Sequence, residues 1–300
     1  MAQSTRLVTV TKGELSNVGM QRLKVARVPR IFDAPMSTGG NLHSDLGADL
    51  GHAIDRNELR IAYQPIISLS DTSVGGFEAL VRWQHPQRGL LQPSAFIPTA
   101  ETSDIIVAID RWMIRPATLQ LARWRAGGIG DHLQMSVNVS SREFSRDDFV
   151  DDLRRILKTS GLHATSLRLE ITETTDMERS ARAKALLAET RSLGVKLDVD
   201  DFGTGYSSLS ALQHMSVDAL KIERSFVASM ASHNGTQLVQ SIITLAHGLG
   251  LVAIAEGVET TEQLDWLAAL DCDFGQGFLF APPLDGDTAG RFPGEGRYAA

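Results

Sequence analysis

Short runs of β-forming residues alternate with helical stretches along most of this chain, and this alternation is what most constrains its fold. Such alternation predicts a parallel sheet whose strands are joined by helices. Candidate strands lie near residues 59–69, 74–83, 134–140, 167–173, 195–201, 219–224, 251–257 and 275–280. About eight strands over about 240 residues suit one closed (β/α)8 barrel better than two separate domains. We therefore expect an α/β fold of the TIM-barrel type.

The barrel should be irregular at its start. Residues 70–73 separate the first two candidate strands and are too few for a crossover helix, so one of the two strands should run antiparallel to its neighbour. Before them, an apolar stripe at helical spacing from Leu46 to Ile54 predicts a helix that begins near Ser44 and ends near Asn57. Residues 1–40 show no sustained period, so we expect a tail or linker over 1–40, a barrel over 41–290 and a second tail over 291–300.

Composition and charge exclude several classes of protein. The 43% hydrophobic and 22% charged residues match an ordinary globular protein rather than a disordered or membrane-spanning one. The net charge of −7 supplies no basic field for a nucleic acid polymer. The single cysteine, Cys272, cannot form an internal disulfide, and the first residues lack the apolar core of a signal peptide. We therefore expect a cytoplasmic protein without membrane insertion.

Polar side chains share one face of the candidate strands. Along residues 167–172, Leu, Leu and Ile alternate with Arg, Glu and Thr, and successive side chains of a strand face opposite ways. If the apolar faces pack against outer helices, the polar faces enter the barrel. Several polar residues then lie at or near the carboxyl ends of their strands, the rim where barrel enzymes do their chemistry: Asn138, Glu170, Asp200, Lys221 and Glu256. Glu78 joins them if its strand runs parallel to the rest.

The acidic residues at this rim predict a divalent metal site. A single carboxylate at a strand end is more often a helix cap or a solvated group, but several at one mouth would repel one another unless a cation offset them. Carboxylates and the amide oxygen of Asn138 are hard ligands that select Mg²⁺ or Mn²⁺ over Zn²⁺. The adjacent Asp200 and Asp201 could serve two ions, which suit phosphodiester hydrolysis. Lys221 would orient the nucleophilic water or balance charge, and its alternative role is a structural salt bridge inside the barrel.

Six short motifs carry a resemblance to a known family. They are Tyr63-Gln-Pro-Ile66, Glu78-Ala-Leu80, Glu170-Ile-Thr-Glu173, the stretch from Asp200 to Leu209, Glu256-Gly-Val-Glu-Thr260 and Gln276-Gly-Phe278. With these motifs in this order, the chain resembles the EAL family of cyclic di-GMP phosphodiesterases from about residue 45 to about residue 285. The resemblance implies an irregular TIM-type barrel that opens cyclic di-GMP to linear pGpG with two Mg²⁺ or Mn²⁺ ions, as a homodimer.

The resemblance also implies roles for individual residues. The metal ligands fall on Glu78, Asn138, Glu170, Asp200, Asp201 and Glu256, and the lysine associated with the catalytic water falls on Lys221. Glu173 matches a glutamate that steadies the following loop. Glu259 matches a residue that supports the site, but it also adjoins a capping box at residues 260–263. The substrate contacts fall on Gln64, Leu80, Arg82 and Gln276.

The sequence departs mildly from the family pattern at two positions, and it leaves alternative functions to be considered. Glu223 stands where the family usually has aspartate, which could shift Lys221 slightly, and Phe278 stands where tyrosine is common. A cyclic di-GMP receptor without hydrolytic activity is the main alternative, although such receptors usually lack some of the ligands present here. A hydrolase for another phosphodiester, or a glycosidase with a carboxylate pair, is a further alternative.

Overall fold

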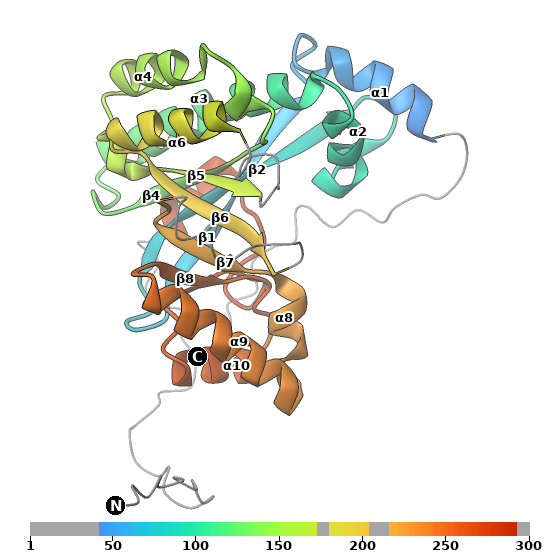
Figure 1. The fold of residues 1–300 in the computed structure, drawn as a ribbon. Helices are drawn as coiled ribbons and strands as arrows, with labels where there is room; N and C mark the ends of the chain where they lie inside the picture. The colour runs from blue at the N-terminus through green and yellow to red at the C-terminus, as the bar shows by residue number, and fades with distance from the viewer. Residues whose placement is uncertain (1–41, 173–179, 204–215, 293–300) are drawn as a thin grey trace, which may run out of the picture.

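Eight strands of this chain close into a barrel in the computed structural model, which describes residues 42–172, 180–203 and 216–292 (Figure 1). Around the barrel the order is β1-β2-β4-β5-β6-β7-β8-β9, because β1 pairs with both β9 and β2. The strands are β1 (Leu59–Ser68), β2 (Val74–His85), β3 (Gly89–Leu91), β4 (Gln134–Val139), β5 (Leu167–Thr172), β6 (Lys196–Phe202), β7 (Ala219–Ile222), β8 (Val252–Ala255) and β9 (Phe274–Gly275). The predicted α/β barrel is confirmed.

One barrel strand runs against the others. β1 pairs antiparallel with both β2 and β9, whereas the other pairings between neighbouring barrel strands, from β2–β4 round to β8–β9, are parallel. The predicted antiparallel strand near the start is therefore β1. Since β2 runs parallel to β4, Glu78 lies on a strand whose carboxyl end is at the same rim as those of the other parallel strands.

Three elements differ from the sequence prediction. The three-residue strand β3, which pairs with β2 outside the barrel, was not predicted. The strand expected over 275–280 is only β9, and the chain after it packs closely on Val258, where a side chain at Gly277 would come 2.1 Å from the Val258 carbonyl oxygen. The Leu279 N–H donates to that same oxygen. The first helix ends at Ala53 instead of near Asn57, which has a left-handed φ of 54°.

Helices cover the outside of the barrel. In Figure 1, α3, α4 and α6 lie on one side, and α8, α9 and α10 lie on the opposite side. The α-helices are α1 (Leu42–Ala53), α2 (Ile97–Glu101), α3 (Ile105–Ala126), α4 (Phe149–Ser160), α6 (Ala181–Ser192), α8 (Arg224–Ala228), α9 (His233–Gly248), α10 (Thr261–Ala269) and α11 (Gly286–Arg291). Within the described ranges, no helix is both long and apolar enough to cross a bilayer.

The barrel interior is polar toward the carboxyl ends of the parallel strands and has a small apolar cluster nearer their amino ends. The outward faces of the strands join the main core, with Leu169 and Leu220 fully buried. A separate small cluster of Ile66, Ala219 and Ile254 belongs to the inward face of the strands, since Ala219 and Lys221 are two residues apart on β7.

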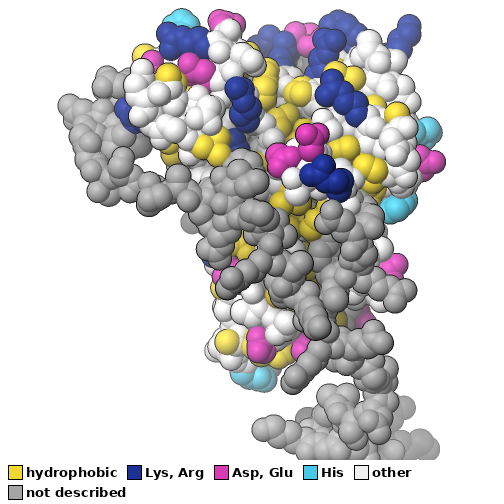
Figure 2. Space-filling model, turned by 180° about the vertical axis from the view of Figure 1, so that it is seen from behind, with side chains coloured by type: hydrophobic (Ala, Val, Ile, Leu, Met, Phe, Trp, Pro, Cys, Tyr) yellow, Lys and Arg dark blue, Asp and Glu magenta, His cyan; other side chains and the backbone are white. Residues whose placement is uncertain are grey.

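The outer surface of the molecule, seen from behind in Figure 2, carries basic side chains mainly toward its upper edge, with acidic ones among them.

A buried ion pair lies in the same inner layer. Arg168 donates from Nε to Oδ2 of Asp198 at 2.6 Å, and the two side chains make a second contact through Nη2 and Oδ1. Lys196 pairs with Asp218, with 2.8 Å between Nζ and Oδ1. Both carboxylate oxygens of Asp198 are therefore used in the pair with Arg168.

Candidate active site

Lys221 lies at the centre of the candidate site, completely buried on β7. Its Nζ is 2.8 Å from Oε2 of Glu170 on β5 and 3.2 Å from Oδ1 of Asp200 on β6. It is 2.5 Å from Oε1 of Glu256, which directly follows β8, and 3.8 Å from Oε2 of Glu78 on β2. Side chains from five strands or strand ends thus meet around one ammonium group, as the alternation of polar residues predicts.

One lysine does not neutralise four carboxylates, and the pKa values show the excess negative charge. Burial, followed by repulsion from Glu78, raises the pKa of Glu170 well above its usual value. Burial also raises the pKa of Glu256 to about 8, although Lys221 opposes the shift. Burial alone would lower the pKa of Lys221, but Asp200, Glu170 and the other carboxylates outweigh it and raise that pKa. The site therefore favours additional positive charge.

Two observations fit a divalent cation at this position. Oε1 of Glu170 is buried and has no hydrogen-bond partner among the described residues. Asp200, Asp201 and Glu256 each present a carboxylate oxygen within 4.8 Å of the others. An unpaired buried carboxylate oxygen and a cluster of hard oxygen ligands are the donors that Mg²⁺ and Mn²⁺ prefer.

An irregularity in β6 allows two consecutive aspartates to contribute. In a regular strand Asp200 and Asp201 would face opposite ways. Here the pairing of β6 with β7 changes register between Val199 and Phe202, and Asp201 has a left-handed φ of 53°. Aspartate tolerates this conformation better than most residues. The local distortion therefore brings both carboxylates to the rim.

Two amide side chains donate hydrogen bonds to the Glu78 carboxylate. Asn138 on β4 donates from Nδ2 to Oε1 of Glu78 at 2.7 Å. Gln276 donates from Nε2 to Oε2 of Glu78 at 2.6 Å and to Oε1 of Gln64 at 3.1 Å. The amide oxygen of Asn138 is thereby left as the atom that could face a cation.

A pocket of about 250 Å³ opens above these groups. Seven of the residues predicted for the site line it: Gln64, Glu78, Leu80, Asp200, Glu256, Glu259 and Gln276. Arg224, Gly257, Gly277 and Phe278 also line it and were not predicted to do so. Arg224 comes three residues after Lys221, where β7 has just ended, so its position at a strand end was the available signal.

The structure gives two of the predicted site residues, Glu259 and Arg82, contacts that the sequence did not predict. Glu259 pairs with Arg224, at 2.6 Å between Oε1 and Nη2, while the neighbouring capping box forms between Thr260 and Gln263. Arg82 is 4% exposed and donates from Nη1 to the carbonyl of Val81 at 2.8 Å. It does not appear among the described residues that line the pocket.

Two glutamates complete the comparison with the sequence. Glu223 accepts a hydrogen bond from the Ser225 N–H at 2.8 Å and caps α8, so its carboxylate is used at the helix start rather than beside Lys221. Glu173 lies outside the described residues.

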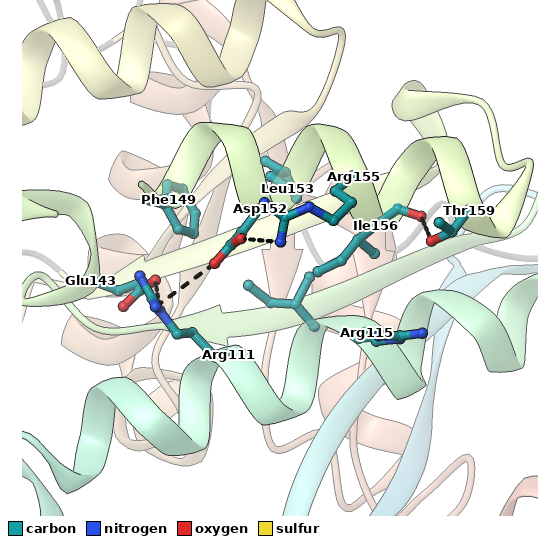
Figure 3. Close-up of a pocket in the computed structure, with 10 residues that line it drawn as sticks. Arg111, Arg115, Glu143, Phe149, Asp152, Leu153, Arg155, Ile156 and Thr159 are labelled. Carbon is teal, nitrogen blue, oxygen red and sulfur yellow. Dashed lines mark hydrogen bonds and ion pairs between the residues drawn. The ribbon is translucent and has the colours of Figure 1, made fainter. Parts of the chain in front are cut away.

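A second pocket, of about 210 Å³, lies between α3 and α4 (Figure 3). Arg111 points between Glu143 and Asp152 there, with its Nε 2.8 Å from Oε1 of Glu143 and its Nη1 3.7 Å from Oδ2 of Asp152. None of the residues predicted for the site lines this pocket. Its ion pairs join α3 to α4 and to the 3-10 helix η2 (Glu143–Ser145).

Comparison with known sequences gives a consistent result. The EAL domain family model matches residues 48–283. An uncharacterized protein of Mycobacterium tuberculosis is 40% identical over 259 residues, which are 86% of this chain and 42% of that protein. The cyclic di-GMP phosphodiesterase NbdA of Pseudomonas aeruginosa is 42% identical over 237 residues, 79% of this chain and 30% of NbdA. The chain thus spans less than half the length of these relatives.

Solved structures with the same fold are also similar. The PaMucR phosphodiesterase in its c-di-GMP complex matches with a TM-score of 0.77 and 36% identity, covering 82% of this chain and 99% of that one. The EAL domain of Mycobacterium smegmatis DcpA matches with a TM-score of 0.69 and 33% identity, covering 80% and 98% respectively.

Proposed function

Because this chain belongs to the EAL domain family, we propose that it is a metal-dependent phosphodiesterase that hydrolyses cyclic di-GMP to linear pGpG. The observation that carries the proposal is the group of carboxylates around Lys221, which holds more negative charge than the described side chains neutralise. An acidic site of this kind binds an anionic diester only if metal ions accompany it.

The metal ligands in this proposal are those that the motifs indicate. Two Mg²⁺ or Mn²⁺ ions would be held by Glu78, Asn138, Glu170, Asp200, Asp201 and Glu256. When bound, such ions supply activation of a water molecule and stabilisation of the charge that develops during hydrolysis. Gln276 and Asn138 would keep the Glu78 carboxylate oriented through their hydrogen bonds to its two oxygens.

Lys221 has two roles in the proposal. Its ammonium group would orient the attacking water by exchanging one of its three close carboxylate contacts for the water oxygen, since Nζ carries only three hydrogens. It would also favour the ionised forms of Glu170 and Glu256, since its charge opposes, without cancelling, the effect of burial on the pKa of each carboxyl. Glu259 would support the site from the pocket wall, and the motifs assign Glu173 a supporting role as well.

The substrate would lie in the pocket above these groups. Gln64 and Gln276 present amide groups to it, and Leu80 presents an apolar surface to which a guanine ring can pack. Arg82 would act from β2, where it lies four residues past Glu78 toward the carboxyl end of the strand and is buried. A homodimer is part of the proposal and is tested separately, by the mass of the protein in solution.

Chromatography of cyclic di-GMP incubated with the purified protein tests this function. The expected result is conversion to pGpG with Mg²⁺ or Mn²⁺ and none with a chelator. Intact dinucleotide that nevertheless binds to the metal-loaded protein would indicate a receptor. Conversion in chelator, or faster hydrolysis of an unrelated linear diester, would contradict the proposal and favour a different hydrolase.

A further inference from the structure

The wall of the pocket is strongly acidic, and one cation interrupts it. Among the described lining residues, the carboxylates are Glu78, Asp200, Glu256 and Glu259, whereas Arg224 is the only lining residue with a positive charge. Lys221 lies beneath them and is buried. A cyclic dinucleotide carries two phosphodiester groups, each with one negative charge. If metal ions accompany the diester that reacts, the other diester still needs a positive partner within an acidic mouth.

The stem of Arg224 is fixed against a glycine. Gly257 has a left-handed φ of 66°, and a Cβ added to it would lie 2.2 Å from Cγ of Arg224. The arginine side chain therefore lies directly on the Gly257 backbone, which any other residue would prevent. The guanidinium lies at the edge of the pocket, since Arg224 and its partner Glu259 both line it.

The guanidinium of Arg224 forms an exposed ion pair, which an incoming anion could replace. Its Nη2 is 2.6 Å from Oε1 of Glu259, and the side chains of Arg224 and Glu259 are 63% and 43% exposed. Exposed ion pairs of this kind contribute little net free energy, so an incoming anion competes with the carboxylate at low cost. A guanidinium also offers two parallel N–H donors, the geometry that a phosphate accepts best.

We propose that Arg224 binds the phosphodiester of cyclic di-GMP that is not being hydrolysed, and that it exchanges its ion pair with Glu259 for this contact. The inference rests on the proposed function and adds to it a determinant of specificity. A substrate with a second phosphodiester on the far side of its ring gains this contact, and a simple diester does not. Arg224 would thus favour cyclic dinucleotides over other phosphodiesters.

Steady-state kinetics of two variants test the proposal. Arg224→Gln keeps a stem over Gly257 and removes the charge, and Arg224→Lys keeps the charge without the planar fork. We expect the Gln variant to raise the KM for cyclic di-GMP about tenfold with kcat changed less than about twofold, since a charge-assisted contact is lost in both the ground state and the transition state. The Lys variant should recover part of the loss. Arg155→Gln is the matched control, because Arg155 is also exposed and paired with an aspartate.

The outcomes separate the two proposals. If the wild-type protein converts cyclic di-GMP and the Gln variant has an unchanged KM, the role of Arg224 is wrong while the proposed function stands. A fall in kcat with constant KM in both variants would also overturn it, because that pattern indicates a role in the chemical step. If the wild-type protein shows no metal-dependent conversion, the proposed function itself fails.

Discussion

Lys221 and Glu170 form an ion pair inside the barrel, with 2.8 Å between Nζ and Oε2 and both side chains fully buried. They belong to β7 and β5, which are separated in the sheet by β6, so the contact crosses the barrel interior. A buried ion pair is stable only when each charge has its partner, since an isolated buried charge is costly. The pair therefore connects the stability of the barrel to the chemistry of its rim.

Replacing Lys221 with methionine should destabilise the metal-free protein. The variant leaves Glu170, Asp200 and Glu256 crowded without their cation, and breaking a buried pair costs about 3–5 kcal/mol. We expect saturating Mn²⁺ to restore part of this loss, because the ions offset the same charges. Denaturant unfolding in chelator and in Mn²⁺ measures both effects.

Lys196→Met is the matched control for this prediction. Lys196 is 37% exposed and pairs with Asp218, so its removal should cost less than about 1 kcal/mol. Equal unfolding free energies for the two lysine variants in chelator would show that Lys221 does not balance the buried carboxylates.

Removing a proposed metal ligand should abolish turnover. Glu78→Ala and Asp200→Ala each delete a carboxylate of the proposed metal site, and the loss of several kcal/mol of transition-state stabilisation lowers kcat by about 10³-fold or more. Initial rates of pGpG formation with Mn²⁺ measure the change. Glu189→Ala, an exposed position on α6, should retain the wild-type rate. Substantial activity in either site variant would refute the assignment of these ligands.

Metal affinity should increase with pH up to about pH 8. Burial raises the pKa of Glu256 to about 8, so below this pH the carboxyl carries a proton that a cation must displace. For one displaced proton the dissociation constant for Mn²⁺ falls about tenfold per pH unit, and it levels off above the pKa. Calorimetric titrations at several pH values between 6 and 9 measure this slope.

The variant Glu256→Gln is informative for the same prediction. The variant lacks one titrating ligand. Its affinity for Mn²⁺ should therefore be weaker, and its dissociation constant should change less with pH between pH 6 and 8. A wild-type dissociation constant that does not change over this range would mean that no protonated ligand competes with the metal.

Much of the barrel and its rim could be predicted from local patterns. The two-residue period places Glu170 and Lys221 on the polar face of their strands, and this needs no knowledge of distant contacts. The short connection at residues 70–73 similarly predicts that one of the first two strands runs antiparallel, which the structure identifies as β1. Such features depend on neighbours in the sequence, which is why they could be recognised.

Features set by distant contacts could not be predicted in this way. The left-handed Asp201 depends on how β6 meets β7, and the Arg224–Glu259 pair joins residues 35 positions apart. The close packing of Gly277 on Val258, just after the early end of β9, likewise joins segments that are distant in the sequence. In each case tertiary packing decides between conformations that the local sequence allows.

Arg111 should contribute strongly to stability although it lies away from the candidate site. Its Nε donates to Oε1 of Glu143 at 2.8 Å, and Glu143 is fully buried with its other oxygen unpaired among the described residues. Burial already raises the pKa of Glu143, and Arg111 is the first of the groups that oppose this. Arg111→Ala would leave that carboxylate without its guanidinium, and we expect a loss of about 2 kcal/mol or more.

Two further variants separate the loss of charge balance from a general effect of removing arginine. Arg155→Ala removes a 73% exposed arginine from the same pocket and should change stability by less than about 0.5 kcal/mol. Adding Glu143→Gln to Arg111→Ala should recover part of the lost stability, because the buried charge itself is then gone. Urea unfolding at pH 7 compares all four proteins. If the double variant is as unstable as Arg111→Ala, the arginine acts through its packing and its ion pairs with Asp148 and Asp152, and not by neutralising Glu143.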